Sequence, residues 1–287
     1  MHQSLLRYQK ARWLKVGTLL ALSAVLLYAW HNPQPTANGG TWLGYTLGTI
    51  GAGLIGWLAW FGIRKRDYRS TSGTVQGWLS AHIYLGLALI IVATLHTGFQ
   101  FAWNLHTLAY VLMCVVILSG IFGLVVYIRY PSLLSDNRNN KTQAQLLQLL
   151  AEADQQAVMA TNPLSADHQA MVDSSIELTQ LGGGLLQQLS GRDHSQVVIN
   201  GQQRDNRNQR AVSQQLATLM GDDNTQTNAQ ARLAIQAINK RSELLQRLRK
   251  DIRIRALLDI WLLIHVPATV ALLAALSAHI FVVFYYW

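Results

Sequence analysis

The chain has 287 residues, of which 51% are hydrophobic and only 13% are charged. A soluble domain of this length carries about 25% charged residues, so the composition excludes an ordinary water-soluble protein. Three blocks contain no Lys, Arg, Asp or Glu at all, namely 16–63, 70–128 and 260–287. About 20 apolar residues cross the hydrocarbon core of a bilayer as a helix. The first two blocks are therefore each long enough for two spans, and the third holds one.

The sequence predicts transmembrane helices at about 14–30, 42–63, 78–99, 105–128 and 257–285. Turn residues in 31–40, rich in Asn, Pro and Gly, separate the first two spans. A signal peptide is the alternative for the first span. No small-residue cleavage site follows it, so we expect a retained helix.

The predicted fold class is all-α: an integral membrane helical bundle of five transmembrane helices, with a helical cytoplasmic insert between spans four and five. Residues 1–128 are expected to form transmembrane helices 1–4, residues 129–255 the insert, and residues 256–287 transmembrane helix 5.

The insert is polar and mainly helical by its pattern. Residues 141–160 have the leucine spacing of an amphipathic helix, and 165–190 are similar but interrupted at Gly182–Gly184. Asn200-Gly201 is the turn signal of a small hairpin. A helix from about residue 227 is expected to continue into the fifth span. A nucleotide-binding glycine loop follows a strand, and no strand precedes this glycine run. We therefore expect the insert to pack on itself or to dock a partner.

Lys and Arg are confined to one side of the predicted bundle. They occupy the N-terminus, 64–69 and 129–255, whereas 31–41, 98–104 and the C-terminal end contain none. Positive charge marks the cytoplasmic side. We expect a multi-pass protein of a bacterial-type inner (cytoplasmic) membrane, with its N-terminus cytoplasmic and its C-terminus periplasmic. Because basic residues beside spans meet anionic headgroups, the net charge of +9 indicates membrane lipid as the partner and no nucleic acid.

Four of the nine histidines share one spacing inside two predicted spans. His82 and His96 are 14 residues apart, and so are His265 and His279. Fourteen residues are close to four helical turns, so each pair lies within about 40° of one face and is separated by roughly 21 Å along the axis. A lone histidine in a span could simply bond a carbonyl. A matched stripe on two helices is not expected by chance, and ionisable groups in lipid are rare and usually functional.

Both spans run from inside to outside, so His82 is expected level with His265, and His96 level with His279. Two facing imidazoles at equal depth are the ligand set of a six-coordinate haem iron. The sequence therefore predicts two b-type haems held by these four histidines. Small residues beside the ligands leave room for a flat macrocycle, and they are Gly86, Ala93, Ala268, Thr269 and Ala275. The only cysteine, Cys114, excludes c-type attachment and a cysteine-ligated iron–sulfur cluster.

These residues resemble the bis-haem b cytochromes, above all the ferric reductase-like transmembrane family that includes the NADPH oxidases. The matching segments are Ser80-Ala-His82, Leu95-His96, Leu263-Ile-His265 and Ala278-His279. The resemblance covers the membrane part only and implies two stacked haems between the third and fifth spans. That family usually has six spans and a flavin- and nicotinamide-binding domain after them, whereas this chain stops at Trp287. We therefore expect no oxidation of a pyridine nucleotide by this chain alone.

Haem propionates need polar partners. For the inner haem the sequence offers Arg66, Arg69, Arg253 and Arg255. For the outer haem it offers no Lys or Arg. His106, with His31, Gln100, Trp103 and Asn104, is expected to satisfy the outer propionates or to line a quinone pocket. An interfacial histidine facing water is the alternative.

The predicted function is that of a diheme electron-transfer subunit of an oxidoreductase complex. It would link the quinone pool to a partner redox protein that docks on the insert or on the outer face. Histidine on both sides of the iron leaves no open position, which favours electron transfer over oxygen binding. Two alternatives stay open: a terminal reductase of external metal ions, oxygen or superoxide at the outer haem, and a non-redox sensor or scaffold anchored by the spans.

Overall fold

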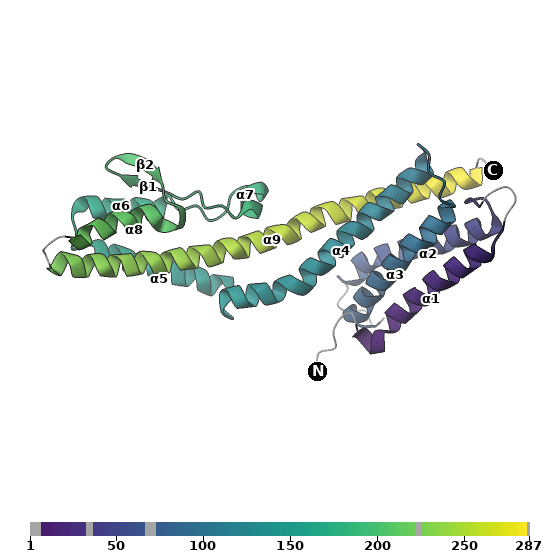
Figure 1. The fold of residues 1–287 in the computed structure, drawn as a ribbon, viewed down its shortest axis with the longest axis horizontal. Coiled ribbons are helices and arrows are strands. Elements are labelled where there is room, and N and C mark those ends of the chain that lie inside the picture. The colour runs from purple at the N-terminus through teal and green to yellow at the C-terminus, as the bar shows by residue number, and fades with distance from the viewer. Residues whose placement is uncertain (1–6, 33–36, 67–72, 222–224, 286–287) are drawn as a thin grey trace. The chain divides into compact units, whose positions relative to one another are not determined.

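The computed structural model describes residues 7–32, 37–66, 73–221 and 225–285. The fold is all-α, about 81% helical, and the one sheet in the described ranges is a two-stranded hairpin (Figure 1). Five helices are long and apolar enough to cross a membrane. They are α1 (Tyr8–Trp30), α2 (Trp42–Arg64), α3 (Val75–Thr97), α4 (Leu105–Arg138) and α9 (Thr225–Tyr285).

The five predicted spans are confirmed as helices, but several of their ends differ. α1 is bounded by Tyr8, but Gln9, Lys10 and Ala11 have left-handed φ values of 45° to 60°, so its regular part begins after Ala11, close to the predicted start near residue 14. α4 continues to Arg138 rather than ending near 128. α9 is one helix of 61 residues that contains the fifth span, as predicted from residue 227 onward. Hydropathy marks where a chain enters apolar surroundings, whereas a helix ends where its backbone hydrogen bonding stops. The two positions need not coincide.

The chain divides into two compact units. The first comprises residues 1–124 and 261–287, and the second comprises residues 125–260. α4 and α9 contribute residues to both, and each unit is described by itself. The expected division at 128/129 and 255/256 concerns where the chain leaves the bilayer, and it stays a prediction.

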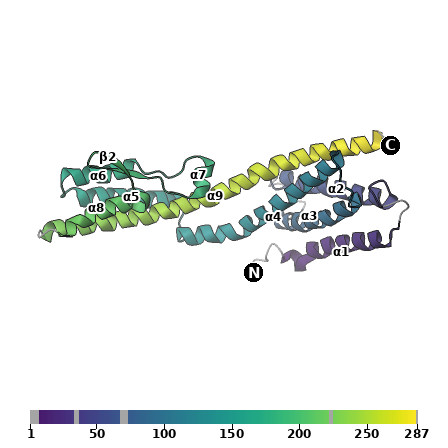
Figure 2. The ribbon, with the colours of Figure 1, turned by 45° about the horizontal axis from the view of Figure 1, so that its top comes forward.

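In the first unit α3 packs against both α1 and α2, as Figure 2 also shows. Small residues allow the close approach: a Cβ at Gly17 of α1 would lie 2.8 Å from the carbonyl oxygen of Tyr84 on α3. The largest apolar core joins four helices, and its buried members are Ile55, Leu58, Ala81, Leu85, Leu89, Met113 and Leu272. This core fixes α2, α3, α4 and α9 against one another around the span histidines.

Local signals set the ends of α3, the helix that carries His82 and His96. The Thr74 hydroxyl accepts a hydrogen bond from the Gly77 N–H at 3.1 Å, which caps the N-terminus. At the C-terminus Gly98 adopts a left-handed conformation with φ of 59°, as helix-ending glycines do. Both histidines therefore lie in one uninterrupted helix, and their helical phase is preserved.

The second unit contains the shorter elements of the chain. Besides parts of α4 and α9, these are α5 (Gln143–Thr161), α6 (Ala166–Glu177), α7 (Leu185–Ser190), β1 (Gln196–Ile199), β2 (Gln202–Asp205), η2 (Arg207–Gln209), α8 (Arg210–Thr218) and η3 (Leu219–Gly221). The predicted break at Gly182–Gly184 separates α6 from α7. The predicted hairpin is confirmed, because β1 pairs antiparallel with β2. Its turn residues Asn200 and Gly201 have φ of 52° and 75°, as a tight hairpin turn requires.

Two apolar clusters and a set of ion pairs fasten this unit to α9. Val172, Val197, Leu216 and Ile238 belong to one cluster, and Leu146, Leu150, Leu245 and Leu248 belong to the other. Buried arginines of α9 complete the packing: Arg241 pairs with Asp154 at 2.5 Å and Arg249 with Asp193 at 2.7 Å.

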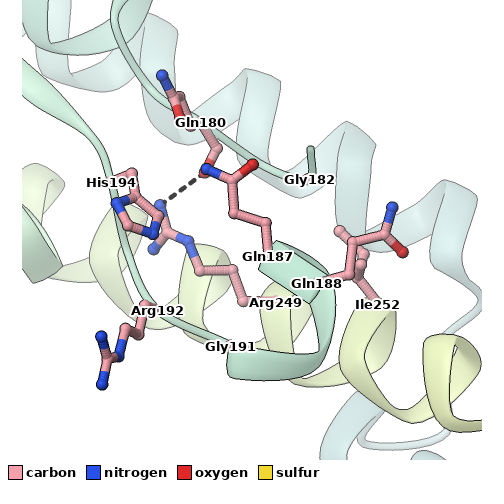
Figure 3. Close-up of a pocket in the computed structure, with 9 residues that line it drawn as sticks. All are labelled: Gln180, Gly182, Gln187, Gln188, Gly191, Arg192, His194, Arg249 and Ile252. Carbon is pink, nitrogen blue, oxygen red and sulfur yellow. Dashed lines mark hydrogen bonds between the residues drawn. The ribbon is translucent and has the colours of Figure 1, made fainter. Parts of the chain in front are cut away.

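Arg249 lines a small pocket, in which its guanidinium donates to the Gln180 carbonyl at 3.1 Å (Figure 3). Burial lowers the pKa of Arg249, while the Asp193 carboxylate opposes that shift and Arg241 adds to it. The positive charge of Arg249 is thus matched by Asp193 within the unit.

Candidate functional site

In the first unit the structure brings together the two histidines that are predicted to hold the outer haem. The ring centroids of His96 on α3 and His279 on α9 are 6.1 Å apart, with an interplanar angle of 80°. Two imidazoles on opposite sides of one metal ion have centroids roughly 6 Å apart, because each metal–nitrogen bond is about 2 Å long and each centroid lies about 1 Å behind its nitrogen. The observed separation matches the one expected for an opposed ligand pair.

The two inner histidines are also neighbours. His82 on α3 lies close enough to His265 on α9 for an electrostatic interaction between the rings. The His82 ring packs against Phe61 at 5.1 Å, and the His265 ring against Trp261 at 5.7 Å. Since His82 is matched with His265 and His96 with His279, α3 and this part of α9 run parallel.

Both α3 histidines bond to the backbone of α2. The Nδ1 of His82 lies 3.1 Å from the Leu58 carbonyl oxygen, and the Nδ1 of His96 lies 2.8 Å from that of Gly44. A carbonyl can only accept, so each Nδ1 carries the proton and donates it. The Nε2 of each neutral ring is then unprotonated, which is the form in which histidine binds a metal.

His265 obtains the same arrangement from a side chain of α4. Its Nδ1 lies 2.9 Å from the Ser119 hydroxyl, and that hydroxyl donates to the Val116 carbonyl at 2.8 Å. Because the Ser119 hydrogen is already used, its oxygen accepts from His265. The Nε2 of His265 is therefore also the unprotonated nitrogen.

His279 differs from the other three, because its partner is another imidazole. Its Nδ1 is hydrogen-bonded to the Nδ1 of His106 at the start of α4. The two ring planes are perpendicular and their centroids are 4.5 Å apart. The structure thus places His106 directly behind the outer histidine pair.

The supporting groups repeat along their helices as the histidines do. Gly44 and Leu58 are 14 residues apart on α2, and His106 and Ser119 are 13 apart on α4. α2 serves both histidines of α3, whereas α4 serves both histidines of α9. In each pair of helices, the supporting group that comes later in the chain contacts the histidine that comes earlier. The supporting helices therefore run antiparallel to the helices that carry the histidines.

Glycines make room for the rings. A Cβ at Gly48 of α2 would lie 2.6 Å from Cε1 of His96, and a Cβ at Gly120 of α4 would lie 3.4 Å from Cε1 of His265. At Gly123 a Cβ would overlap the ring of Trp261. Gly86, one turn after His82, faces open space, since a Cβ there would meet no atom within 4 Å.

Within the described part of the first unit, two buried side-chain nitrogen atoms have no hydrogen-bond partner. They are Nε1 of Trp261, one turn before His265, and Nε2 of His31 at the end of α1. A buried donor without a partner is costly, and an indole nitrogen can only donate. Trp261 therefore offers a free N–H beside the inner pair.

The other residues predicted to contact the propionates or a quinone lie in different parts of the structure. Gln100 donates to the Ala37 carbonyl at 3.1 Å, Asn104 accepts from the Thr107 N–H at 2.9 Å, and Trp103 is fully exposed. Arg66 is exposed, and Arg69 lies outside the described residues. Arg253 and Arg255 belong to the second unit, where Arg255 pairs with Asp251 at 3.3 Å. Their expected role at the propionates stays a prediction.

Sequence reasoning missed the groups that hold the histidines. The carbonyls of Leu58 and Gly44 carry no side-chain signal. Ser119, Gly120 and Gly123 do form a run of small residues on one face of α4, and this pattern is typical of close helix contacts in membranes. It could have indicated where α4 meets α9.

Among the described residues, no group of three or more His, Cys, Asp or Glu side chains is arranged to hold a metal ion. No protein-family model, curated protein or solved structure matches the chain. The spacing and geometry of the histidines themselves therefore indicate what the chain can do.

Proposed function

We propose that this chain is a diheme b-type membrane cytochrome. His82 and His265 would ligate an inner haem, and His96 and His279 an outer one. The protein would carry electrons across the membrane as a subunit that links the quinone pool to a partner redox protein. Its N-terminus would be cytoplasmic and its C-terminus periplasmic.

The observation that carries the proposal is the state of the imidazoles. Three of the four donate from Nδ1 to an oxygen of another helix, and His279 is bonded through Nδ1 to His106. Metal-binding histidines are held in this way, with one nitrogen anchored and the other turned to the metal. The 6.1 Å spacing of His96 and His279 supports an opposed pair. A histidine that only satisfied a carbonyl would need no second imidazole opposite.

The surrounding residues fit a macrocycle with propionates. Gly86 leaves open space one turn from His82, and the unpartnered N–H of Trp261 is a donor for a carboxylate beside the inner pair. A haem with two histidine ligands supplies a one-electron iron couple with no open position for oxygen. The chain's own contribution is to hold the ligands, fix their tautomers and satisfy the carboxylates.

The first test is haem content. The full-length protein, purified in detergent, should contain two haems b and show reduced-minus-oxidised b-type absorption bands. His96→Ala and His279→Ala should each remove one haem, and His82→Ala and His265→Ala should each remove the other. The two classes should therefore differ in which spectral component is lost.

A matched control is His168→Ala, which alters a half-buried histidine of the second unit whose side chain is hydrogen-bonded to Ser165 at 2.6 Å. It should retain both haems. Folded protein without b-type bands would overturn the proposal. Reoxidation of the reduced protein by a quinone analogue, compared with chelated iron or oxygen, then separates quinone-linked transfer from terminal reduction.

A further inference from the structure

The contact between His106 and His279 distinguishes the outer site from the inner one. His106 lies in the first turn of α4, where Asn104 accepts from the Thr107 N–H at 2.9 Å and so caps the helix. This cap fixes the first turn of α4, in which His106 lies. The His106 ring is exposed, yet its Nδ1 is engaged by His279.

Only one hydrogen lies between the two Nδ1 atoms. If His279 binds iron through Nε2, that nitrogen carries no proton, and the ring proton of His279 is on Nδ1. His279 then donates to His106, and the proton of the neutral His106 ring is on Nε2. The reverse assignment would put the proton of His279 on Nε2 and block ligation there.

The group that accepts the Nδ1 hydrogen of a histidine ligand affects the reduction potential of the iron. The other three histidines donate to oxygen, from the Leu58 and Gly44 carbonyls and the Ser119 hydroxyl. An imidazole nitrogen is a stronger base than an amide carbonyl. A stronger acceptor raises the basicity of the ligand, and a more basic ligand favours ferric over ferrous iron.

We infer that His106 is a positioning residue of the outer haem, which accepts the Nδ1 hydrogen of His279, orients that ring and lowers the reduction potential of the outer haem. This inference rests on the proposed function. It assigns His106 to the iron ligand rather than to the propionates or to a quinone.

The test is a potentiometric titration of the purified holoprotein, followed optically, with electron paramagnetic resonance of the ferric haems. In His106→Leu the outer haem should become easier to reduce. At a fixed potential its oxidised-to-reduced ratio should fall about tenfold, which is about 59 mV for one electron. The inner haem should not change. In His106→Asn the amide oxygen can accept the same hydrogen, so the shift should be smaller and the resonance closer to wild type.

Ser119→Ala is the matched comparison, because it removes the acceptor of His265 and should move only the inner haem. Both haems bound with unchanged potentials and resonances in His106→Leu would overturn the inference and leave the proposed function standing. Loss of the outer haem in His106→Asn would also overturn it, by making His106 an iron ligand. A wild-type protein without haem would overturn the proposed function and this inference together.

Discussion

At the scale of single residues, the four span histidines are distinguished by what lies behind them. Each Nδ1 is bonded to a group 24 to 173 residues away in the chain. Three of those groups are oxygen atoms and the fourth is an imidazole. Because one nitrogen is anchored, the ring cannot rotate freely and its second nitrogen has a fixed direction. The rings of His96 and His265 pack against glycines, so their position is sensitive to a single added methyl group.

Gly48→Ala tests this sensitivity. The new Cβ would lie 2.6 Å from Cε1 and 2.9 Å from Nδ1 of His96, so the ring must shift and its bond to Gly44 must weaken. We expect loss or a changed spectrum of the outer haem, with the inner haem retained, measured by haem content and reduced-minus-oxidised spectra.

Gly53→Ala is the control on the same helix, because a Cβ there would meet nothing within 4 Å. It should retain both haems. Equal behaviour of the two variants would show that the contact between Gly48 and His96 does not hold the ring.

At the scale of elements, each histidine-bearing helix is paired with one helix whose groups hydrogen-bond to its histidines. α2 supports the histidines of α3 and α4 supports those of α9, each through groups that repeat at nearly the histidine spacing. In the second unit α9 has another role, because its buried arginines form ion pairs with aspartates of other segments. Asp193 accepts from the Ser195 N–H at 2.9 Å and the Asn208 N–H at 2.7 Å while it pairs with Arg249. One carboxylate thus joins the segment before the hairpin, the segment after it and α9.

Asp193→Asn should therefore destabilise the second unit. It leaves the guanidinium of Arg249 buried without a counter-charge, and breaking a buried pair costs roughly 3–5 kcal/mol. In limited proteolysis of the full-length protein, cleavage within 125–260 should be more than about a hundredfold faster, since it tracks the population of the opened state.

The exposed pair of Asp205 and Arg207 provides the control. Its side chains are 55% and 67% exposed, and exposed pairs contribute little. Asp205→Asn should leave the cleavage rate near that of the unchanged protein. If Asp193→Asn behaves in the same way, Asp193 does not hold the unit together.

At the scale of the whole molecule, Lys and Arg occur before the first apolar helix, in 64–69 and in 129–255, whereas the connections 31–41 and 98–104 contain none. Described residues of the opposite connections include Gly98 to Asn104, where Phe99, Phe101 and Trp103 are exposed. Aromatic side chains are enriched at membrane interfaces. This distribution supports the proposed orientation, in which that connection faces the periplasm.

Cysteine labelling tests the orientation. In a Cys114→Ala background, Trp103→Cys should react with a membrane-impermeant maleimide in intact cells. Arg66→Cys should react only after the membrane is opened. Both positions are exposed, so both should react in detergent. The reverse pattern in intact cells would contradict the proposed topology.

Most of the helical architecture could be predicted from the sequence, because apolar blocks and helical periodicity are properties of short segments. The five long helices, the break at Gly182–Gly184 and the hairpin at Asn200-Gly201 are of this kind. α8 was not predicted, since its nine residues are too few for a clear period. The end of α4 was displaced because hydropathy does not report where backbone hydrogen bonding stops.

The sequence by itself determined which residues form the candidate site, since a spacing of 14 on two helices needs only the helical repeat to be interpreted. Only the tertiary structure decided how those residues are held. The carbonyls of Leu58 and Gly44, the hydroxyl of Ser119 and the ring of His106 reach the histidines through contacts between helices far apart in the chain. No local pattern encodes such contacts, because they depend on how whole helices pack.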